Sequence, residues 1–174
     1  KHPDVSDFID AKLEQGKITG ANISVRMDDE FMNAVQKDGI YVHKYPINSE
    51  NPVYTKEVRA RDLWDKIVHN AWKSAEPGIL FWDTIINESL PDCYADLGYK
   101  TVSTNPCGEI PLCAYDSCRL LAINLFSYVE KPFTNKANFN WTLFKSHVGI
   151  DQRLMDDIID LELKKIDNIL QKIA

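Results

Sequence analysis

Residues 103–112 constrain this chain more than any other segment, and they read Ser-Thr-Asn-Pro-Cys-Gly-Glu-Ile-Pro-Leu. Pro106 has no N–H group and biases the residue before it away from the helical region, so the segment is predicted to be extended and to end a strand. In an extended segment, side chains two residues apart point to the same side. Asn105, Cys107 and Glu109 are therefore expected to face one small volume.

The three side chains of this segment bring together an amide, a thiol and a carboxylate. A carboxylate can transfer protons, a thiol can react through its sulfur, and an amide can orient a bound group. A strand of the hydrophobic core would carry Val, Ile or Leu at such positions. The pattern predicts a reactive site with Cys107 as the sulfur, Glu109 as the general acid or base and Asn105 as the orienting group. A solvated loop without chemistry is the alternative.

The chain has four cysteines, Cys93, Cys107, Cys113 and Cys118. A disulfide framework is disfavoured, because a chain with a full set of aliphatic residues and no secretion signal does not need such cross-links. The spacing C-x13-C-x5-C-x4-C lacks the paired C-x2-C that structural zinc sites prefer. Catalytic thiols remain, with Cys93 and Cys113 expected to be small buried hydrophobic side chains.

Composition and charge narrow the class of protein. A chain of 174 residues, 44% hydrophobic and 26% charged, is ordinary for one globular domain with a sizeable core. Its net charge of −6 argues against a general nucleic-acid binder. No apolar run approaches the ~20 residues of a membrane span, and no signal peptide is visible, so a cytoplasmic protein is expected. Because the chain begins at Lys1 and not at Met, we expect a piece of a longer polypeptide.

Hydrophobic periodicity, capping residues and turn residues predict an α/β organisation. Helices are expected over residues 3–16, 28–39, 58–75 and 141–173, with Gly149 as a candidate break in the last. Strands are expected over 18–27, 40–45 and 120–126, the last one buried. Residues 48–52 and 91–100 are predicted to be a turn and a loop, and 79–82 fit either a strand or the start of a helix.

Several segments resemble ribonucleotide reductase large subunits, above all the adenosylcobalamin-dependent class II enzymes. Residues 105–109 are similar to the active-site loop of that family. Residues 115–118 resemble the segment with the cysteine that follows this loop in the family, and residues 120–125 resemble its Leu-Gly-Ser-Ile-Asn-Leu strand. One departure is Leu121-Ala122, where the family usually has Gly followed by a small residue. Upstream, residues 20–32 and 77–83 resemble the Asn-Ile-Ser-Val…Asp-Phe-Met and Pro-Gly-Ile-x-Phe-x-Asp elements. The matches follow the family's order across most of the chain.

This resemblance implies a fragment of the ten-stranded α/β barrel of ribonucleotide reductase large subunits. Residues 1–100 would form the end of the first half-barrel, 101–119 the region of the active-site finger loop, and 120–174 the start of the second half-barrel. Since a barrel that is cut open exposes strand edges and apolar faces, we also expect the fragment to self-associate.

The resemblance further implies that ribonucleotides are reduced to 2′-deoxyribonucleotides by a thiyl-radical mechanism. Cys107 would be the thiyl residue that removes the 3′-hydrogen, Glu109 would accept the 3′-hydroxyl proton, and Asn105 would hydrogen-bond to the ribose hydroxyls. Cys118, with a cysteine outside this chain, would supply electrons and end as a disulfide. The fragment alone is expected to be inactive, and no metal site is predicted in it.

Cofactors and partners follow from the same resemblance. Adenosylcobalamin would generate the radical in the full chain but is not expected to bind the fragment alone, and an external dithiol of the thioredoxin type would reduce the disulfide. A ribonucleoside di- or triphosphate would be the substrate, nucleotides would act as effectors, and the full-length chain would form homo-oligomers. Neither nucleic acid nor a membrane is an expected partner. Two alternatives stay open: a class I large subunit, which receives its radical from a partner protein, and a non-catalytic module with a cysteine-bound metal.

Overall fold

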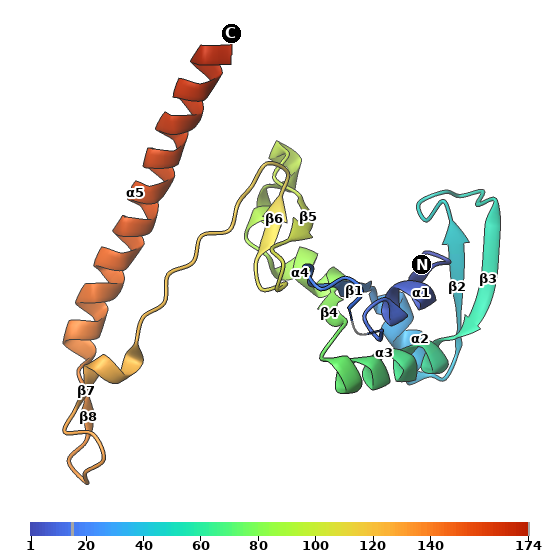
Figure 1. The fold of residues 1–174 in the computed structure, drawn as a ribbon, viewed down its shortest axis with the longest axis horizontal. Coiled ribbons are helices and arrows are strands. Elements are labelled where there is room, and N and C mark those ends of the chain that lie inside the picture. The colour runs from blue at the N-terminus through green and yellow to red at the C-terminus, as the bar shows by residue number, and fades with distance from the viewer. Residues whose placement is uncertain (15, 174) are drawn as a thin grey trace. The chain divides into compact units, whose positions relative to one another are not determined.

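The chain folds into two units, which meet in sequence between Cys118 and Arg119 (Figure 1). The computed structural model describes residues 1–14 and 16–173. Within these residues the strands pair into four separate two-stranded sheets, and no closed barrel is formed. The mixed α/β class predicted from the sequence is confirmed, and so is the expectation that the chain is not a complete barrel.

The first unit is built on a parallel pair of strands, β1 (Ser24–Met27) and β4 (Gly78–Phe81). Residue 24 lies opposite residue 78 in this register, and the remaining three pairs follow in order. The two strands approach closely at their first pair, because a Cβ atom on Gly78 would lie only 2.7 Å from the Ser24 hydroxyl oxygen. The strand predicted over 18–27 is shorter in the structure, where it covers residues 24–27. The reason is that β4 pairs with these four residues only, so the backbone before them has no strand partner among the described residues.

Two helices and a hairpin connect these strands. Helix α2 (Asp29–Gln36) confirms the predicted helix, and strand β2 (Ile40–Tyr45) has the predicted bounds. Strand β3 (Tyr54–Arg59) pairs antiparallel with β2, and helix α3 (Ala60–Ser74) follows it directly. The predicted helix start at 58 was thus wrong by two residues, and β3 was missed because its run of charged residues lacks the alternation that marks a half-buried strand.

Helix α1 (Val5–Asp10) is shorter than the predicted 3–16. The reason is a tertiary contact: the side-chain amide of Asn70, which is only 2% exposed, donates to the Ile9 carbonyl oxygen at 3.0 Å. In a longer helix that carbonyl would accept from the N–H of Leu13. The side chain of Asn70 on α3 therefore takes the place of the next helical hydrogen bond.

The core of the first unit lies where α1, α2 and α3 pack against β1 and β2 (Figure 1). Asp28 caps α2, because its carboxylate accepts from the N–H of Phe31 at 2.8 Å. Burial alone would raise the pKa of Asp28, but hydrogen bonds from Phe31, Lys1 and Tyr41 outweigh it and lower that pKa. The buried members of this core are Ile9, Val25, Met27, Phe31, Val35, Tyr41, Ala60 and Ile67.

After β4, helix α4 (Trp82–Glu88) begins at once, so residues 79–82 end a strand and open a helix. The predicted loop over 91–100 contains a 3₁₀ helix, η1 (Pro91–Leu97). The unit closes with the antiparallel strands β5 (Thr101–Thr104) and β6 (Pro111–Cys113).

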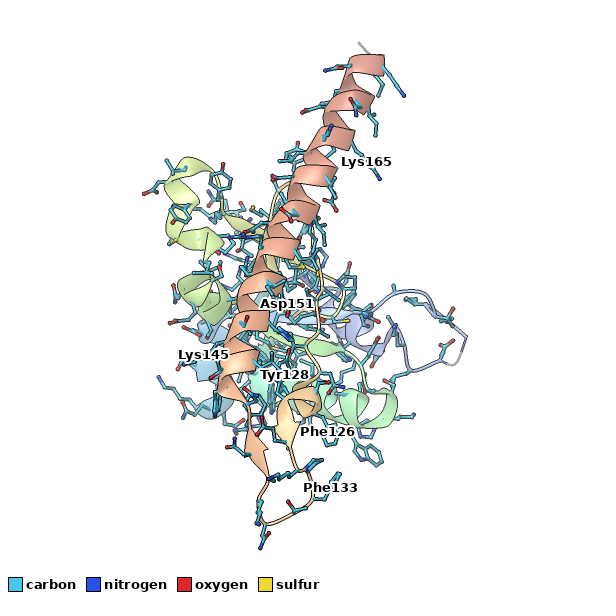
Figure 2. All side chains as sticks on the ribbon, turned by 90° about the vertical axis from the view of Figure 1, so that its left-hand side faces the viewer. Phe126, Tyr128, Phe133, Lys145, Asp151 and Lys165 are labelled. Atoms are coloured by element: carbon cyan, nitrogen blue, oxygen red, sulfur yellow. The ribbon has the colours of Figure 1, made fainter. Side chains whose placement is uncertain are left out.

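The second unit consists of a 3₁₀ helix η2 (Leu125–Tyr128), a short hairpin and one long helix. The hairpin strands are β7 (Val129–Glu130) and β8 (Asn138–Phe139), and the helix is α5 (Trp141–Ile173). Tyr128 lies beside the first turns of α5 (Figure 2), where its hydroxyl is 2.9 Å from His147 Nδ1. Aromatic rings of the hairpin and of α5 surround it, namely Phe139, Phe144 and His147.

Helix α5 confirms the helix predicted at the end of the chain. Its 33 residues run without a break at Gly149. None of its described residues is buried, and a series of large apolar side chains along it is exposed. The helix therefore presents an apolar face that the described residues do not cover.

The buried strand predicted over 120–126 was wrong. Residues 119–124 have no regular secondary structure, and Leu120 and Leu121 are 75% and 39% exposed. A strand needs a neighbouring backbone to satisfy its N–H and C=O groups. Among the described residues no strand pairs with this segment, so its strand-like sequence stays unpaired.

Candidate active site

The cysteine loop predicted from the sequence lies at the tip of the β5–β6 hairpin. The two strands pair Thr104 with Pro111, and residues 105–110 connect them. Residues 105–108 form a tight turn in which the N–H of Gly108 donates to the carbonyl oxygen of Asn105 at 3.0 Å. Proline at the second position and glycine at the fourth are typical of such a turn. The predicted end of a strand before Asn105 is confirmed.

The turn changes the geometry that was expected of the three site residues. An extended segment would point Asn105, Cys107 and Glu109 to one side, but Asn105 is buried whereas Cys107 and Glu109 are exposed. The extended geometry was therefore wrong across residues 105–108, because the turn interrupts the two-residue alternation. No hydrogen bond joins any two of the three side chains among the described residues.

Asn105 holds the loop closed. Its side-chain oxygen accepts from the N–H of Ile110 at 2.9 Å, and its own N–H donates to the Ile110 carbonyl oxygen at 3.2 Å. With 7% of its surface exposed, Asn105 is one of few buried polar residues of the first unit. Its side-chain NH₂ group makes no hydrogen bond with a described residue, so its two N–H donors remain available.

Gly108 fits the loop against strand β4. Its φ angle is +86°, and a Cβ atom there would lie 2.9 Å from Cδ2 of Leu80. Both the backbone conformation and the space require glycine. The loop therefore rests on the parallel β1–β4 pair.

The Cys107 thiol is exposed and free. Its sulfur accepts a hydrogen bond from the side-chain amide of Asn22, with Nδ2 and Sγ 3.6 Å apart. Asn22 precedes β1, so this contact joins segments that lie 85 residues apart in the sequence. Sequence reasoning recognised the segment around Asn22 as family-like but assigned no role to this residue.

The other three cysteines are also free thiols. Cys118, at the end of the first unit, is half-buried. Cys113 is half-buried and donates to the Asp116 carboxylate at 3.6 Å, and burial, followed by that carboxylate, raises the pKa of its thiol. Cys93 is exposed and donates to the Leu90 carbonyl oxygen at 2.9 Å. Burial was expected for Cys93 and Cys113, and for Cys93 this was wrong because η1 presents that side chain to solvent.

The base of the hairpin is tied to η1 through one carboxylate. Asp92 accepts hydrogen bonds from the hydroxyls of Ser89 and Thr101 and, at 3.1 Å, from the N–H of Thr101. Burial alone would raise the pKa of Asp92, but these hydrogen bonds outweigh it and lower that pKa. A negative charge on Asp92 therefore anchors the start of β5, a role that no sequence pattern pointed to.

A groove of about 780 Å³ lies beside the loop. Its walls are mostly apolar side chains of β4, α4 and the segment from Ile110 to Leu112, and Gly108 lies at its edge. Among the described residues that line it, Glu88 and Asp116 are the charged ones. The groove gives the loop an apolar flank and offers no cation to bind an anion.

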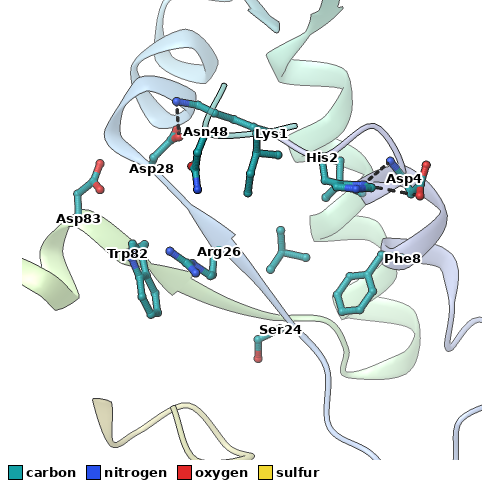
Figure 3. A pocket seen from close by; sticks show the side chains of 13 residues that line it. Lys1, His2, Asp4, Phe8, Ser24, Arg26, Asp28, Asn48, Trp82 and Asp83 are labelled. Atoms are coloured by element: carbon teal, nitrogen blue, oxygen red, sulfur yellow. Dashed lines mark hydrogen bonds and ion pairs between the residues drawn. The ribbon is translucent and has the colours of Figure 1, made fainter. Parts of the chain in front are cut away.

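A second cavity of about 610 Å³ lies between α1, β1 and the start of α4 (Figure 3). Here the Arg26 guanidinium stacks on Trp82, with its central carbon 3.5 Å from the ring centroid. Burial lowers the pKa of Arg26, and Asp83 opposes that shift. The side-chain nitrogen of Lys1 forms an ion pair with the Asp28 carboxylate at 3.1 Å, at the top of the cavity in Figure 3. The cavity is lined by both cationic and carboxylate side chains. It therefore has no clear preference for a positively or a negatively charged ligand.

No metal centre accompanies the cysteines in the part of the chain that the structure describes. Nowhere in residues 1–14 and 16–173 do three His, Cys, Asp or Glu side chains gather closely enough to bind an ion. The described helices also include none whose length and hydropathy would let it cross a lipid bilayer.

The fold and the loop define an α/β fragment that presents one exposed thiol and one exposed carboxylate at the tip of a hairpin. The model of the family described as "Ribonucleotide reductase, barrel domain" matches residues 1–173. The chain therefore belongs to the ribonucleotide reductase barrel-domain family, and the resemblance inferred from its sequence is confirmed.

Individual relatives agree with this membership. The chain is 34% identical over 180 residues to the vitamin B12-dependent ribonucleoside-diphosphate reductase of Thermoplasma acidophilum, an alignment that covers 99% of the chain and 22% of that protein. It is 34% identical over 161 residues to the enzyme of the same name from Mycobacterium tuberculosis, with 92% and 22% covered. For the vitamin B12-dependent ribonucleotide reductase of Streptomyces avermitilis the identity is 29% over 179 residues, with 89% and 18% covered. The chain thus spans about a fifth of the length of these curated relatives.

Proposed function

We propose that this chain is the active-site loop region of a class II ribonucleotide reductase that reduces ribonucleoside diphosphates to 2′-deoxyribonucleotides. The observation that carries the proposal is the exposed Cys107 thiol on a turn closed by Asn105, within a chain of the ribonucleotide reductase barrel-domain family. Residues 1–100 would end the first half-barrel, 101–119 would carry the finger loop, and 120–174 would open the second half-barrel. The unpaired segment 119–124 and the uncovered face of α5 are consistent with neighbours supplied by a longer polypeptide.

Cys107 and Glu109 would act on the ribose. Both side chains are exposed, so a nucleotide could reach them in a site completed by other parts of a longer chain. A Cys107 thiyl radical would take the 3′-hydrogen atom and become a thiol again, while Glu109 would accept the proton of the 3′-hydroxyl group. The hydroxyl at C2′ would leave as water with a proton from the reducing thiol pair. The Cys107 thiol would finally return a hydrogen atom to C3′ and become a thiyl radical again.

Asn105 would serve two purposes at once. Its side-chain oxygen is engaged by the N–H of Ile110, whereas its side-chain NH₂ group has no partner among the described residues. The NH₂ group would donate to a ribose hydroxyl while the oxygen keeps the loop closed. We therefore propose that Asn105 acts on the ribose through its side-chain nitrogen.

Cys118 would provide reducing electrons. Two thiols, that of Cys118 and one from a cysteine outside this chain, would lose two electrons and two protons to the substrate and form a disulfide. An external dithiol of the thioredoxin type would then reduce that disulfide by thiol–disulfide exchange. The half-buried Cys118 is consistent with a thiol that becomes reactive when substrate and reductant reach it.

The residues of the loop are compatible with adenosylcobalamin as the source of the radical. Cys107 is exposed, and among the described residues its sulfur accepts a hydrogen bond from Asn22 alone. Adenosylcobalamin would supply, when bound to the longer chain, a carbon-centred radical able to take a hydrogen atom from a thiol. For the longer chain we also propose nucleotide effectors, homo-oligomers and a cytoplasmic location, where ribonucleotides and dithiol reductants are present.

The test is ribonucleoside diphosphate reduction by the longer polypeptide that contains this chain, with adenosylcobalamin and a dithiol. We expect turnover in the wild type, none in Cys107→Ala, and unchanged turnover in Cys93→Ala, which removes an exposed thiol outside the loop. Turnover that needs a separate radical-generating protein would assign the chain to class I. Absence of turnover under both conditions, together with stoichiometric zinc, would support the non-catalytic metal-binding module.

A further inference from the structure

We propose that Asn22 is a positioning residue for the Cys107 thiol, an inference that rests on the proposed function. The Asn22 side-chain nitrogen is 3.6 Å from the Cys107 sulfur, and it is the hydrogen-bond donor that the described residues offer to this sulfur. Sulfur is a weak acceptor, so such a contact steers the thiol more than it stabilises the fold.

The position of Asn22 is defined by its neighbour in the chain. Ile23 is 9% exposed, and its carbonyl oxygen accepts from the N–H of Gly78 at 2.9 Å. The absence of a side chain at Gly78 permits this approach, because a Cβ atom there would collide with the hydroxyl of Ser24. The backbone beside Asn22 is therefore held by burial and by the first contact of the β1–β4 pair.

The cysteine loop is held to the same strand pair from its other side. Gly108, next to Cys107 in the sequence, lies against Leu80 on β4, and Asn105 ties the loop to Ile110. Asn22 lies two residues before β1, and Leu80 lies in β4, so both are anchored to the same parallel pair. Together they determine where the Cys107 sulfur lies relative to the scaffold.

Hydrogen-atom transfer requires this control of direction. The sulfur has to approach one hydrogen of the substrate, and small displacements of a reacting atom can lower a rate strongly. The same contact holds the exposed sulfur where an alkylating reagent can reach it, and access is one of the factors that set the rate of alkylation. Loss of the Asn22 amide should therefore affect both the reactivity of Cys107 and the turnover of the enzyme.

The experiment uses the longer polypeptide and measures two quantities for each variant. The first is the rate at which iodoacetamide alkylates Cys107, resolved by peptide mass spectrometry, with Cys93 as the internal reference. The second is steady-state ribonucleotide reduction. In Asn22→Ala we expect alkylation of Cys107 to slow about threefold and kcat to fall about tenfold with KM little changed.

Two further substitutions separate positioning from general damage to the fold. Asn22→Gln keeps an amide donor and should recover part of both losses, whereas Asn22→Asp removes the donor and should not. Asn33→Ala is the matched control, because Asn33 is an exposed asparagine of α2 whose side chain makes no hydrogen bond with a described residue. We expect it to leave both quantities unchanged.

The outcomes distinguish this inference from the proposed function. Wild-type kinetics and unchanged Cys107 alkylation in Asn22→Ala would overturn the role of Asn22, even if Cys107→Ala abolishes turnover. Slower alkylation in Asn22→Ala and Asn22→Asp, in a protein that reduces no ribonucleotide, would support the positioning of Cys107 and overturn the proposed function.

Discussion

Replacing Asn105 by alanine should open the cysteine loop without unfolding the chain. The substitution removes the oxygen that accepts from the N–H of Ile110 at 2.9 Å, at a position where Asn105 is 7% exposed. A half-buried N–H group that loses its partner costs about 1–2 kcal/mol. Because one to two kcal/mol corresponds to a factor of about 5–30 in a local equilibrium, the Ile110 amide should exchange its hydrogen faster by that factor.

Hydrogen exchange measured residue by residue on the chain provides the assay. Asn105→Asp is the matched variant, because aspartate retains an acceptor oxygen for the Ile110 N–H, and it should preserve most of the protection. Amides in the core, such as that of Phe31, should exchange at the same rate in all three proteins. Equal protection of Ile110 in the wild type and in Asn105→Ala would refute the reasoning, since the Asn105 side chain would then not hold the loop.

Three further predictions concern the scaffold. Gly108→Ala should destabilise the chain by about 1–2 kcal/mol in denaturant unfolding, because Gly108 has a φ of +86° and a Cβ atom there would lie 2.9 Å from Leu80. Gly149→Ala on α5 should not destabilise it, because outside the helix's own backbone no described residue lies within 4 Å of the added Cβ atom. Asp28→Ala should cost about 1–2 kcal/mol at neutral pH through loss of the α2 cap. The pKa of Asp28 is lowered in the folded chain, so its contribution to the free energy of unfolding is present above its ordinary pKa of about 4 and is lost as the pH falls through the folded value. The stability difference between Asp28→Ala and the wild type should therefore shrink in acid. A stability difference that does not change between about pH 7 and pH 2 would contradict this. The exposed apolar face of α5 should make the chain self-associate, which sedimentation would detect. Ile159→Glu places a charge among these exposed apolar side chains and should reduce the association. A monodisperse wild-type monomer would count against the prediction.

Local features of the sequence determined the elements whose causes are local. Strand β2 and helix α2 follow from alternation, periodicity and the capping carboxylate of Asp28, all of which act within a few residues. The long helix α5 follows from periodicity alone, because one glycine costs a helix of this length little. The family was likewise readable from residue types in their order along the chain.

Contacts between distant residues decided the rest. Asn70 ends α1 by capturing a carbonyl oxygen from another helix, and strand β3 exists because β2 pairs with it despite its charged sequence. The contact between Asn22 and Cys107 depends on the β1–β4 pair, which lies against the loop at Gly108. The sequence shows which hydrogen-bond donors and acceptors are present. Which of them pair depends on distance and burial, and these are fixed only when segments as far apart as 85 residues pack together.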